Sequence, residues 1–160
     1  MLTSEQMATL KADILAATDQ ATVDARANGQ TTVLAGIYNQ AASPAFYVWR
    51  TSFTPDQARE AISGGDGLAQ LDNLTAGKRD SLLWVFDGNT NPSNATQRNA
   101  IVSLCGTQNT LKAAIAAAQK RTVTRAERLF VTGTGTEDSP GTLGWEGTLS
   151  GDDVASAMSA

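Results

Sequence analysis

Apolar residues recur every three or four positions along most of this chain, which is the spacing of one face of an α-helix. Residues 7–17 show this clearly, with Met7, Leu10 and Ile14 in register. Helix start signals precede several such segments, because a Thr or Asn stands three residues before a Gln or Glu. The pattern predicts a mainly α fold, a compact bundle of about six or seven short helices near residues 4–17, 32–40, 55–63, 73–86, 94–105, 108–120 and 124–131.

One segment departs from the helical spacing, because residues 43–53 gather aromatic side chains in a short stretch. Pro44 disfavours helical backbone in the residue before it and favours an extended conformation. A buried aromatic side chain removes about 150–250 Å² from water, so we expect the helices on either side to close over this extended aromatic segment. Phe46, Trp49 and Phe53 are the predicted structural core residues.

The composition changes after residue 131. Residues 132–151 hold six glycines and five threonines, and such a stretch buries too little apolar surface to offset its own ordering entropy. Residues 152–158 then follow Ser150 as a short capped helix. We therefore expect a helical domain at residues 1–131 and a glycine-rich C-terminal arm at residues 132–160 that ends in a short helix.

Three large apolar residues stand in this arm, namely Leu143, Trp145 and Leu149. They have two interpretations. They can fold the arm back onto its own domain, or they can be anchors that order the arm on a partner, as sparse large side chains do in coupled folding and binding. The second interpretation makes these three the predicted partner-binding residues.

Charge and composition make several classes of function improbable for this chain. The net charge is −4, from 12 basic and 16 acidic residues that are interspersed, whereas binding to nucleic acid requires a basic surface. Histidine, the commonest general base and metal ligand, is absent. Cys105 is the single cysteine, so it forms no internal disulfide and is expected to be a buried, inert thiol. Because no signal segment or long apolar run is visible, we expect synthesis and retention in a cytoplasm.

One motif suggests a metal site and fails on inspection. Asp87, Asn89 and Asn91 have the spacing that opens a calcium-binding loop. The loop then requires a Gly where this chain has Pro92, and a bidentate Glu where it has Arg98. A polar turn is the better interpretation, and no metal or cofactor is expected.

A glycan hydrolase would require two carboxylates that converge in a cleft. Glu146, beside Trp145, is the only Glu with a large apolar neighbour in the arm. A single carboxylate next to a Trp does not make such a site, so the sequence predicts no enzyme.

The chain resembles a family of small virion proteins encoded in the structural gene clusters of tailed phages. The segments that carry the resemblance occur in the same order and span nearly the whole chain. They are residues 2–14 (LTSEQMATLKADI), 42–51 (ASPAFYVWRT), 125–130 (RAERLF), 133–136 (GTGT) and 146–147 (EG).

The resemblance implies a structural role in the virion, after assembly in the host cytoplasm. The expected architecture, a helical core with a long C-terminal arm, is similar to that of the head–tail connectors called adaptors. Adaptors form rings of twelve subunits on the portal and bind it through the arm. The expected partners are therefore the portal protein, other neck or tail proteins and further copies of the chain, with no sequence-specific nucleic acid and no membrane. The alternatives are a capsid decoration (cement) protein, a minor tail protein or, in another class, a tail-associated glycan hydrolase.

Overall fold

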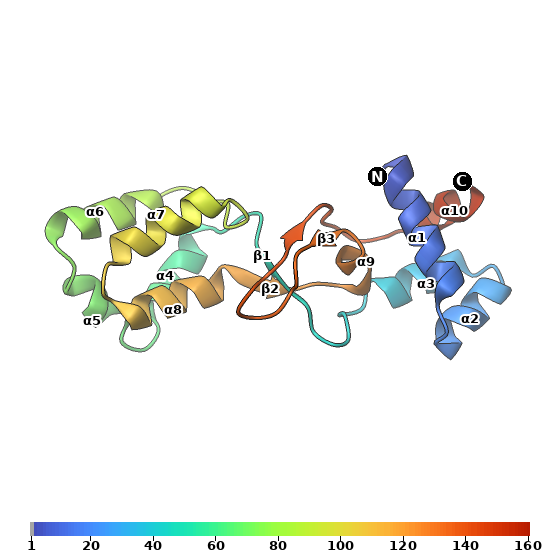
Figure 1. The fold of residues 1–160 in the computed structure, drawn as a ribbon, viewed down its shortest axis with the longest axis horizontal. Helices are drawn as coiled ribbons and strands as arrows, with labels where there is room; N and C mark the ends of the chain where they lie inside the picture. Colours follow the sequence, from blue (N-terminus) through green and yellow to red (C-terminus); the bar gives the residue numbers. More distant parts are fainter. Residues whose placement is uncertain (1) are drawn as a thin grey trace. The chain divides into compact units, whose positions relative to one another are not determined.

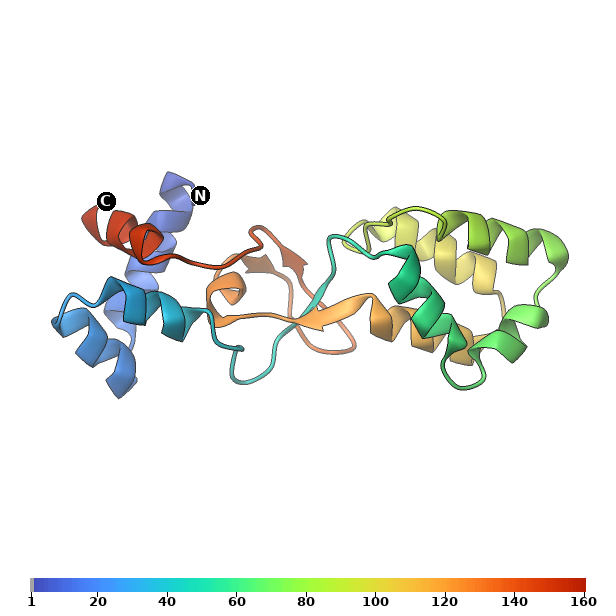
Figure 2. The same cartoon turned by 180° about the vertical axis from the view of Figure 1, so that it is seen from behind.

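A computed structural model describes residues 2–160 of the chain, and it is mainly helical, as the apolar spacing predicts (Figure 1). The chain divides into two compact units. Unit 1 comprises the residues up to Tyr47 together with Thr122–Ala160, and unit 2 comprises Val48–Arg121. The chain therefore passes twice between the units, near residues 48 and 121, the teal and orange segments of Figure 2.

Unit 1 contains both ends of the described chain. Its elements are α1 (Ser4–Ala16), α2 (Gln20–Ala27), α3 (Thr31–Tyr38), α9 (Arg125–Arg128), β3 (Val131–Thr132), β4 (Thr142–Leu143) and α10 (Gly151–Ser159). Helix α10 packs against α1 and α3, so the first and last helices lie side by side (Figure 1). Strands β3 and β4 form an antiparallel pair in which Val131 is opposite Leu143.

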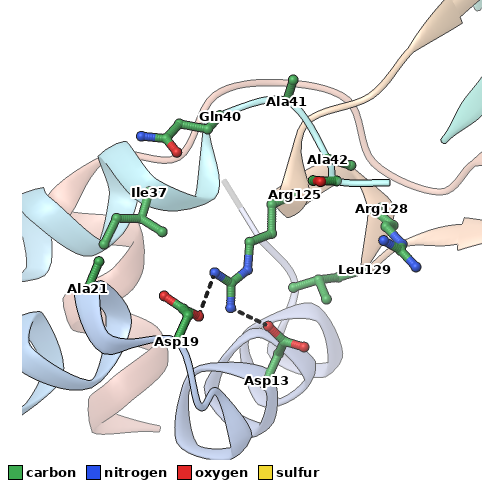
Figure 3. Close-up of a pocket in the computed structure, with 11 residues that line it drawn as sticks. Asp13, Asp19, Ala21, Ile37, Gln40, Ala41, Ala42, Arg125, Arg128 and Leu129 are labelled. Carbon is green, nitrogen blue, oxygen red and sulfur yellow. Dashed lines mark hydrogen bonds and ion pairs between the residues drawn. The ribbon is translucent and has the colours of Figure 1, made fainter. Parts of the chain in front are cut away.

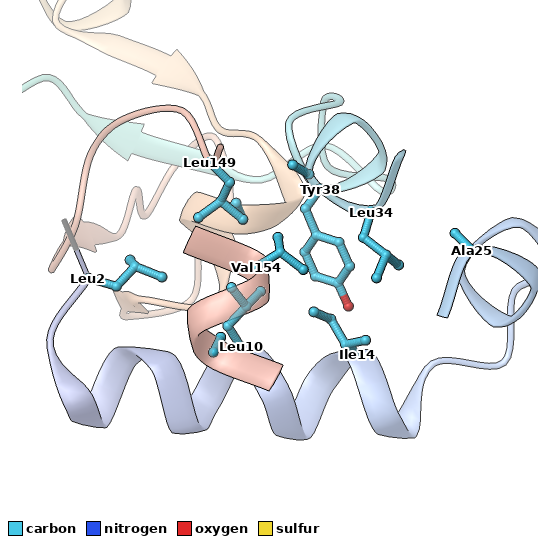
Figure 4. Packing of buried hydrophobic residues seen from close by; sticks show 11 residues of the cluster. Leu2, Leu10, Ile14, Ala25, Leu34, Tyr38, Leu149 and Val154 are labelled. Atoms are coloured by element: carbon cyan, nitrogen blue, oxygen red, sulfur yellow. The ribbon is translucent and has the colours of Figure 1, made fainter. Parts of the chain in front are cut away.

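The core of unit 1 combines residues from the start, the middle and the end of the chain. Leu10 and Ile14 of α1, Leu34 of α3 and Val154 of α10 are each at most 1% exposed (Figure 4). Capping boxes fix three of the helix starts: Thr3 caps α1, Thr124 caps α9 and Ser150 caps α10. Burial of these apolar side chains is the main stabilising contribution to the unit.

Unit 2 is a cluster of five helices. They are α4 (Pro55–Ser63), α5 (Gly67–Asp72), α6 (Ala76–Val85), α7 (Ala95–Cys105) and α8 (Asn109–Ala118). Helix α8 packs against α4, α5 and α7, and α6 packs against α7. The core residues Leu82, Leu111 and Ile115 are at most 1% exposed, and Cys105 is buried among them. The expectation of a buried thiol at Cys105 is confirmed.

The extended aromatic segment contains β1 (Tyr47–Trp49), which pairs with β2 (Lys120–Thr122) in a two-stranded sheet. Phe53 is fully buried and meets Phe86 edge to face, with the ring centroids 5.9 Å apart. Trp49 is half-buried beneath the guanidinium of Arg98, which lies 4.3 Å from the ring centroid. Phe46 is also half-buried.

The sequence pattern does not predict two of the observed helices, α2 and α5. In each case a local feature of the sequence explains why the helix is missed. In α2 the start signal is Asp19, whose carboxylate accepts a hydrogen bond from the backbone N–H of Thr22; the polar, alanine-rich segment gives little apolar spacing. In α5 the first residue is Gly67, and glycine is a poor helix former. A Cβ at this position would collide with the carbonyl oxygen of Ile62, so the glycine permits a close approach of the backbone.

The two compact units of the structure do not correspond to the expected division at residue 131. Residues 132–160 belong to unit 1, together with α1, α2 and α3, whereas residues 48–121 form the other unit. The physical reason is that Leu149, Val154 and Ala157 are buried in the core of unit 1. Composition describes the flexibility of an isolated glycine-rich segment and gives no information about this long-range packing.

Candidate functional site

A cluster of charged side chains in unit 1 surrounds a cavity of about 560 Å³. It lies where the loop after α1, the end of α3 and helix α9 meet (Figure 3). Its lining residues are Asp13, Asp19, Ala21, Ile37, Gln40, Ala41, Ala42, Ser43, Arg125, Arg128 and Leu129. The volume is that of a small-molecule pocket, so the chemistry of the lining residues decides what it can do.

Arg125 is the centre of this cluster. Its Nη1 lies 3.0 Å from Asp19 Oδ2 and donates to Thr22 Oγ1 at 3.2 Å, and its Nη2 lies 3.7 Å from Asp13 Oδ2 (Figure 3). The guanidinium also covers the ring of Tyr38, with 4.3 Å between its Cζ and the ring centroid. Arg125 thus ties α9 to α1, to the start of α2 and to the end of α3.

The acid–base properties of the cluster favour the ionic form of Asp19 and the neutral form of Tyr38. Hydrogen bonds from the side chain and backbone of Thr22, and then the interaction with Arg125, lower the pKa of Asp19 to about 2. Burial raises the pKa of Tyr38, and so does the hydrogen bond that its hydroxyl donates to Asp13 Oδ2 at 2.5 Å. At neutral pH the cluster is therefore a set of paired charges around a neutral phenol.

These groups are engaged with one another. Asp13, Asp19 and Tyr38 all bond to neighbours within the cluster, so the cluster holds the surrounding helices together. Arg128 also lines the cavity, but its side chain is exposed. Its guanidinium lies 5.4 Å from the ring centroid of Phe46. Sequence reasoning did not identify this cluster, because 106 positions separate Asp19 from Arg125 and no local pattern relates the two residues.

The structure places the three predicted partner-binding residues in different environments. Leu143 is half-buried on β4, and Trp145 is half-buried against Phe130, edge to face with 5.6 Å between the ring centroids. Leu149 is 3% exposed and belongs to the core of unit 1. The three side chains therefore do not form one exposed strip, and Leu149 is covered by its own unit.

The backbone at Leu149 is held by one side chain. Asn39 follows α3, and its Oδ1 accepts a hydrogen bond from the N–H of Leu149 at 2.9 Å. Its Nδ2 donates to the carbonyl of Leu149, also at 2.9 Å. The amide of Asn39 thus satisfies both backbone groups of one residue, which fixes the entry into α10.

The loop that suggested calcium is a hydrogen-bonded turn. Asn91 Oδ1 accepts hydrogen bonds from the backbone N–H and the hydroxyl of Ser93, at 3.0 and 2.5 Å. Among residues 2–160, no group of three or more His, Cys, Asp or Glu side chains is placed to hold a metal ion. In the same part of the chain, no helix has both the length and the apolar character needed to cross a membrane.

Comparison with known proteins places the chain in no group: no family model, no curated protein and no solved structure matches it.

Proposed function

We propose that this chain is a structural virion protein of a tailed phage, a head–tail adaptor that forms a ring on the portal. The observation that carries the proposal is the resemblance of five ordered segments, from residues 2–14 to residues 146–147, to small virion proteins of this kind. The mainly helical fold is the fold expected of an adaptor, whereas stoppers and tail terminators are largely β. The step from fold to role rests on this analogy of fold.

The burial of Leu149 means that only two of the three predicted anchors in the glycine-rich arm remain open to a partner. Trp145 and Leu143 are half-buried and retain surface that a partner can contact, whereas Leu149 is buried. In the proposed complex Trp145 and Leu143 contact the portal, and Leu149 holds the segment onto unit 1 in the orientation that presents them. Partners then bind a preorganised surface, which lowers the entropic cost of association.

The test is the mass of the complex in solution. Light scattering of the purified chain with portal rings should show a complex that contains about twelve copies of the 16.7 kDa subunit per portal. Replacing Trp145 by Ala should weaken portal binding by about 2 kcal/mol or more, as expected of an aromatic residue at the centre of an interface.

A second tryptophan variant provides the matched control. Trp84 lies in unit 2 and is 79% exposed, so Trp84→Ala removes the same side chain from another surface and should leave portal binding unchanged. Circular dichroism must show that Trp145→Ala remains folded, because Trp145 packs against Phe130. A chain that stays monomeric beside portal rings, or binds them equally well without Trp145, contradicts the proposal.

A further inference from the structure

A groove in unit 2 has the chemical character of a carbohydrate-binding site. It has a volume of about 510 Å³ and lies between the end of α6, the turn that follows and the start of α7. Its lining residues are Trp84, Val85, Asp87, Gly88, Asn89, Thr90, Gln97 and Ala100. The volume falls within the usual range of small-ligand sites.

Trp84 is the first reason to assign a ligand to this groove. Its side chain is 79% exposed, the largest exposed fraction among the exposed large hydrophobic residues of the described chain. The neighbouring Leu82 and Phe86 are buried, so α6 packs in its unit without Trp84. A large aromatic ring that lies open beside a groove is typical of a binding surface.

The turn after α6 supplies the polar groups. Asp87 and Asn89 are exposed, and neither side chain forms a hydrogen bond or ion pair with another described residue. The side-chain amide of Gln97 uses its oxygen to accept the N–H of Asn91 at 2.7 Å, which leaves its NH₂ group as a donor. The groove therefore presents a carboxylate and two amides beside an aromatic ring.

Thr90 is a second and independent observation. It is only 8% exposed, and its Oγ1 is buried with no hydrogen-bond partner among the described residues. Its backbone N–H and carbonyl are both paired with Phe53, at 3.0 and 2.9 Å, so the position of the residue is fixed. A buried hydroxyl without a partner is unfavourable in the free protein, and Thr90 is one of the residues that line the same groove.

These groups select the class of ligand. One face of a pyranose ring carries C–H bonds that match the negative face of an indole, and its edge carries hydroxyls that bond to carboxylate and amide groups. The lining has no basic side chain and includes the carboxylate of Asp87, which disfavours phosphates and other anions. We propose that the groove binds a neutral saccharide, with the sugar stacked on Trp84 and its hydroxyls bonded to Asp87, Asn89 and Thr90.

This inference is independent of the proposed function, because it concerns unit 2 whereas portal binding was assigned to Trp145 in unit 1. It assigns binding without hydrolysis, since Asp87 is the only acidic residue that lines the groove and glycoside hydrolysis normally requires two carboxyl groups. A virion protein with such a site would adhere to a neutral glycan.

The test is a titration of the full chain with three neutral oligosaccharides: chitotetraose, cellotetraose and maltotetraose. Heteronuclear NMR should show that at least one of them, at up to about 10 mM, shifts the indole N–H signal of Trp84 and the amides of residues 87–90 with a measurable Kd. Trp84→Ala should weaken this binding at least tenfold. Leu83→Ala is the matched control, because Leu83 is the 47% exposed neighbour on α6 and does not line the groove.

Thr90→Val is the variant with the sharpest signature. It removes the hydroxyl and keeps the shape of the side chain, so it should leave the free protein equally stable or more stable while weakening saccharide binding. A hydroxyl with a structural role would instead give a less stable protein. The inference is overturned if none of the three saccharides shifts these signals, if Trp84→Ala binds as well as the parent, or if Trp84→Ala abolishes portal binding and thereby assigns Trp84 to a protein interface.

Discussion

Replacing Leu149 by Ala is the perturbation that distinguishes most sharply between a free arm and an arm packed into unit 1. Leu149 is 3% exposed within a cluster that includes Leu10 and Val154. The substitution removes three buried carbon atoms, a loss of about 2.4 kcal/mol at ~0.8 kcal/mol per buried CH₂ group. The cavity that remains adds to this loss, and buried Leu→Ala changes cost about 2–5 kcal/mol in total. We expect about 3 kcal/mol, a large fraction of the stability of a domain.

The assay is urea unfolding followed by circular dichroism, together with amide hydrogen exchange read separately for the two units. The exchange data are needed because two compact units need not unfold in one step. Exchange should accelerate in α1, α3 and α10 of unit 1, whereas the amides of α8 in unit 2 should keep their protection. Leu15→Ala is the matched control, because Leu15 lies on α1 of the same unit and is 52% exposed; it should cost less than about 0.5 kcal/mol.

The contrary result is equally clear. If Leu149→Ala destabilises the protein no more than Leu15→Ala does, the burial of Leu149 makes no energetic contribution. Residues 132–160 would then be a loosely attached segment, as their composition suggests, and Leu149 would again be available as an anchor for the portal.

Two further predictions concern unit 1. Because the pKa of Asp19 is lowered to about 2, its ionised form stabilises the fold above its ordinary pKa of 3.8, and this contribution is lost as the pH falls from about 4 to 2. Asp19→Asn should therefore reduce the loss of stability over this window, and an NMR titration of the parent that places the Asp19 midpoint near 4 would contradict the hydrogen bonding described for it. Gly135 has a φ of 66°, and a Cβ there would collide with the ring of Phe46, so Gly135→Ala should lower the melting temperature. Gly36→Ala, on open helix surface, should raise it, since Ala exceeds Gly in helix propensity by about 1 kcal/mol; equal melting temperatures for the two variants would refute this reasoning.

The sequence predicts the local structure of the chain well and its long-range organisation poorly. The start of α4 follows from Thr54-Pro55-Asp56-Gln57, and the structure has the capping box and the first-turn Pro at that place. Such signals involve only a few neighbouring residues, so they can be recognised in a single sequence. In contrast, the pairing of Asn39 with Leu149 joins residues 110 positions apart, and no periodicity encodes it.

The same limit applies to the candidate sites. Trp84 stands among the apolar residues of its predicted helix, and its spacing does not distinguish it clearly from Leu82 and Leu83 as a core residue. Only the packing of α6 against α7 decides which face is covered and leaves Trp84 exposed. Composition identified Leu143, Trp145 and Leu149 as anchors, but whether an anchor meets its own domain or a partner depends on tertiary contacts.

The position of the protein in the virion is the most direct test of the proposed function. The measurement is electron microscopy of intact phage particles in which this chain carries a small affinity tag labelled with gold. The adaptor proposal predicts label at the neck, between head and tail, on nearly every particle. Label spread over the capsid surface would indicate a decoration protein, label along the tail or at its tip would indicate a tail protein, and particles without label would contradict a virion role altogether.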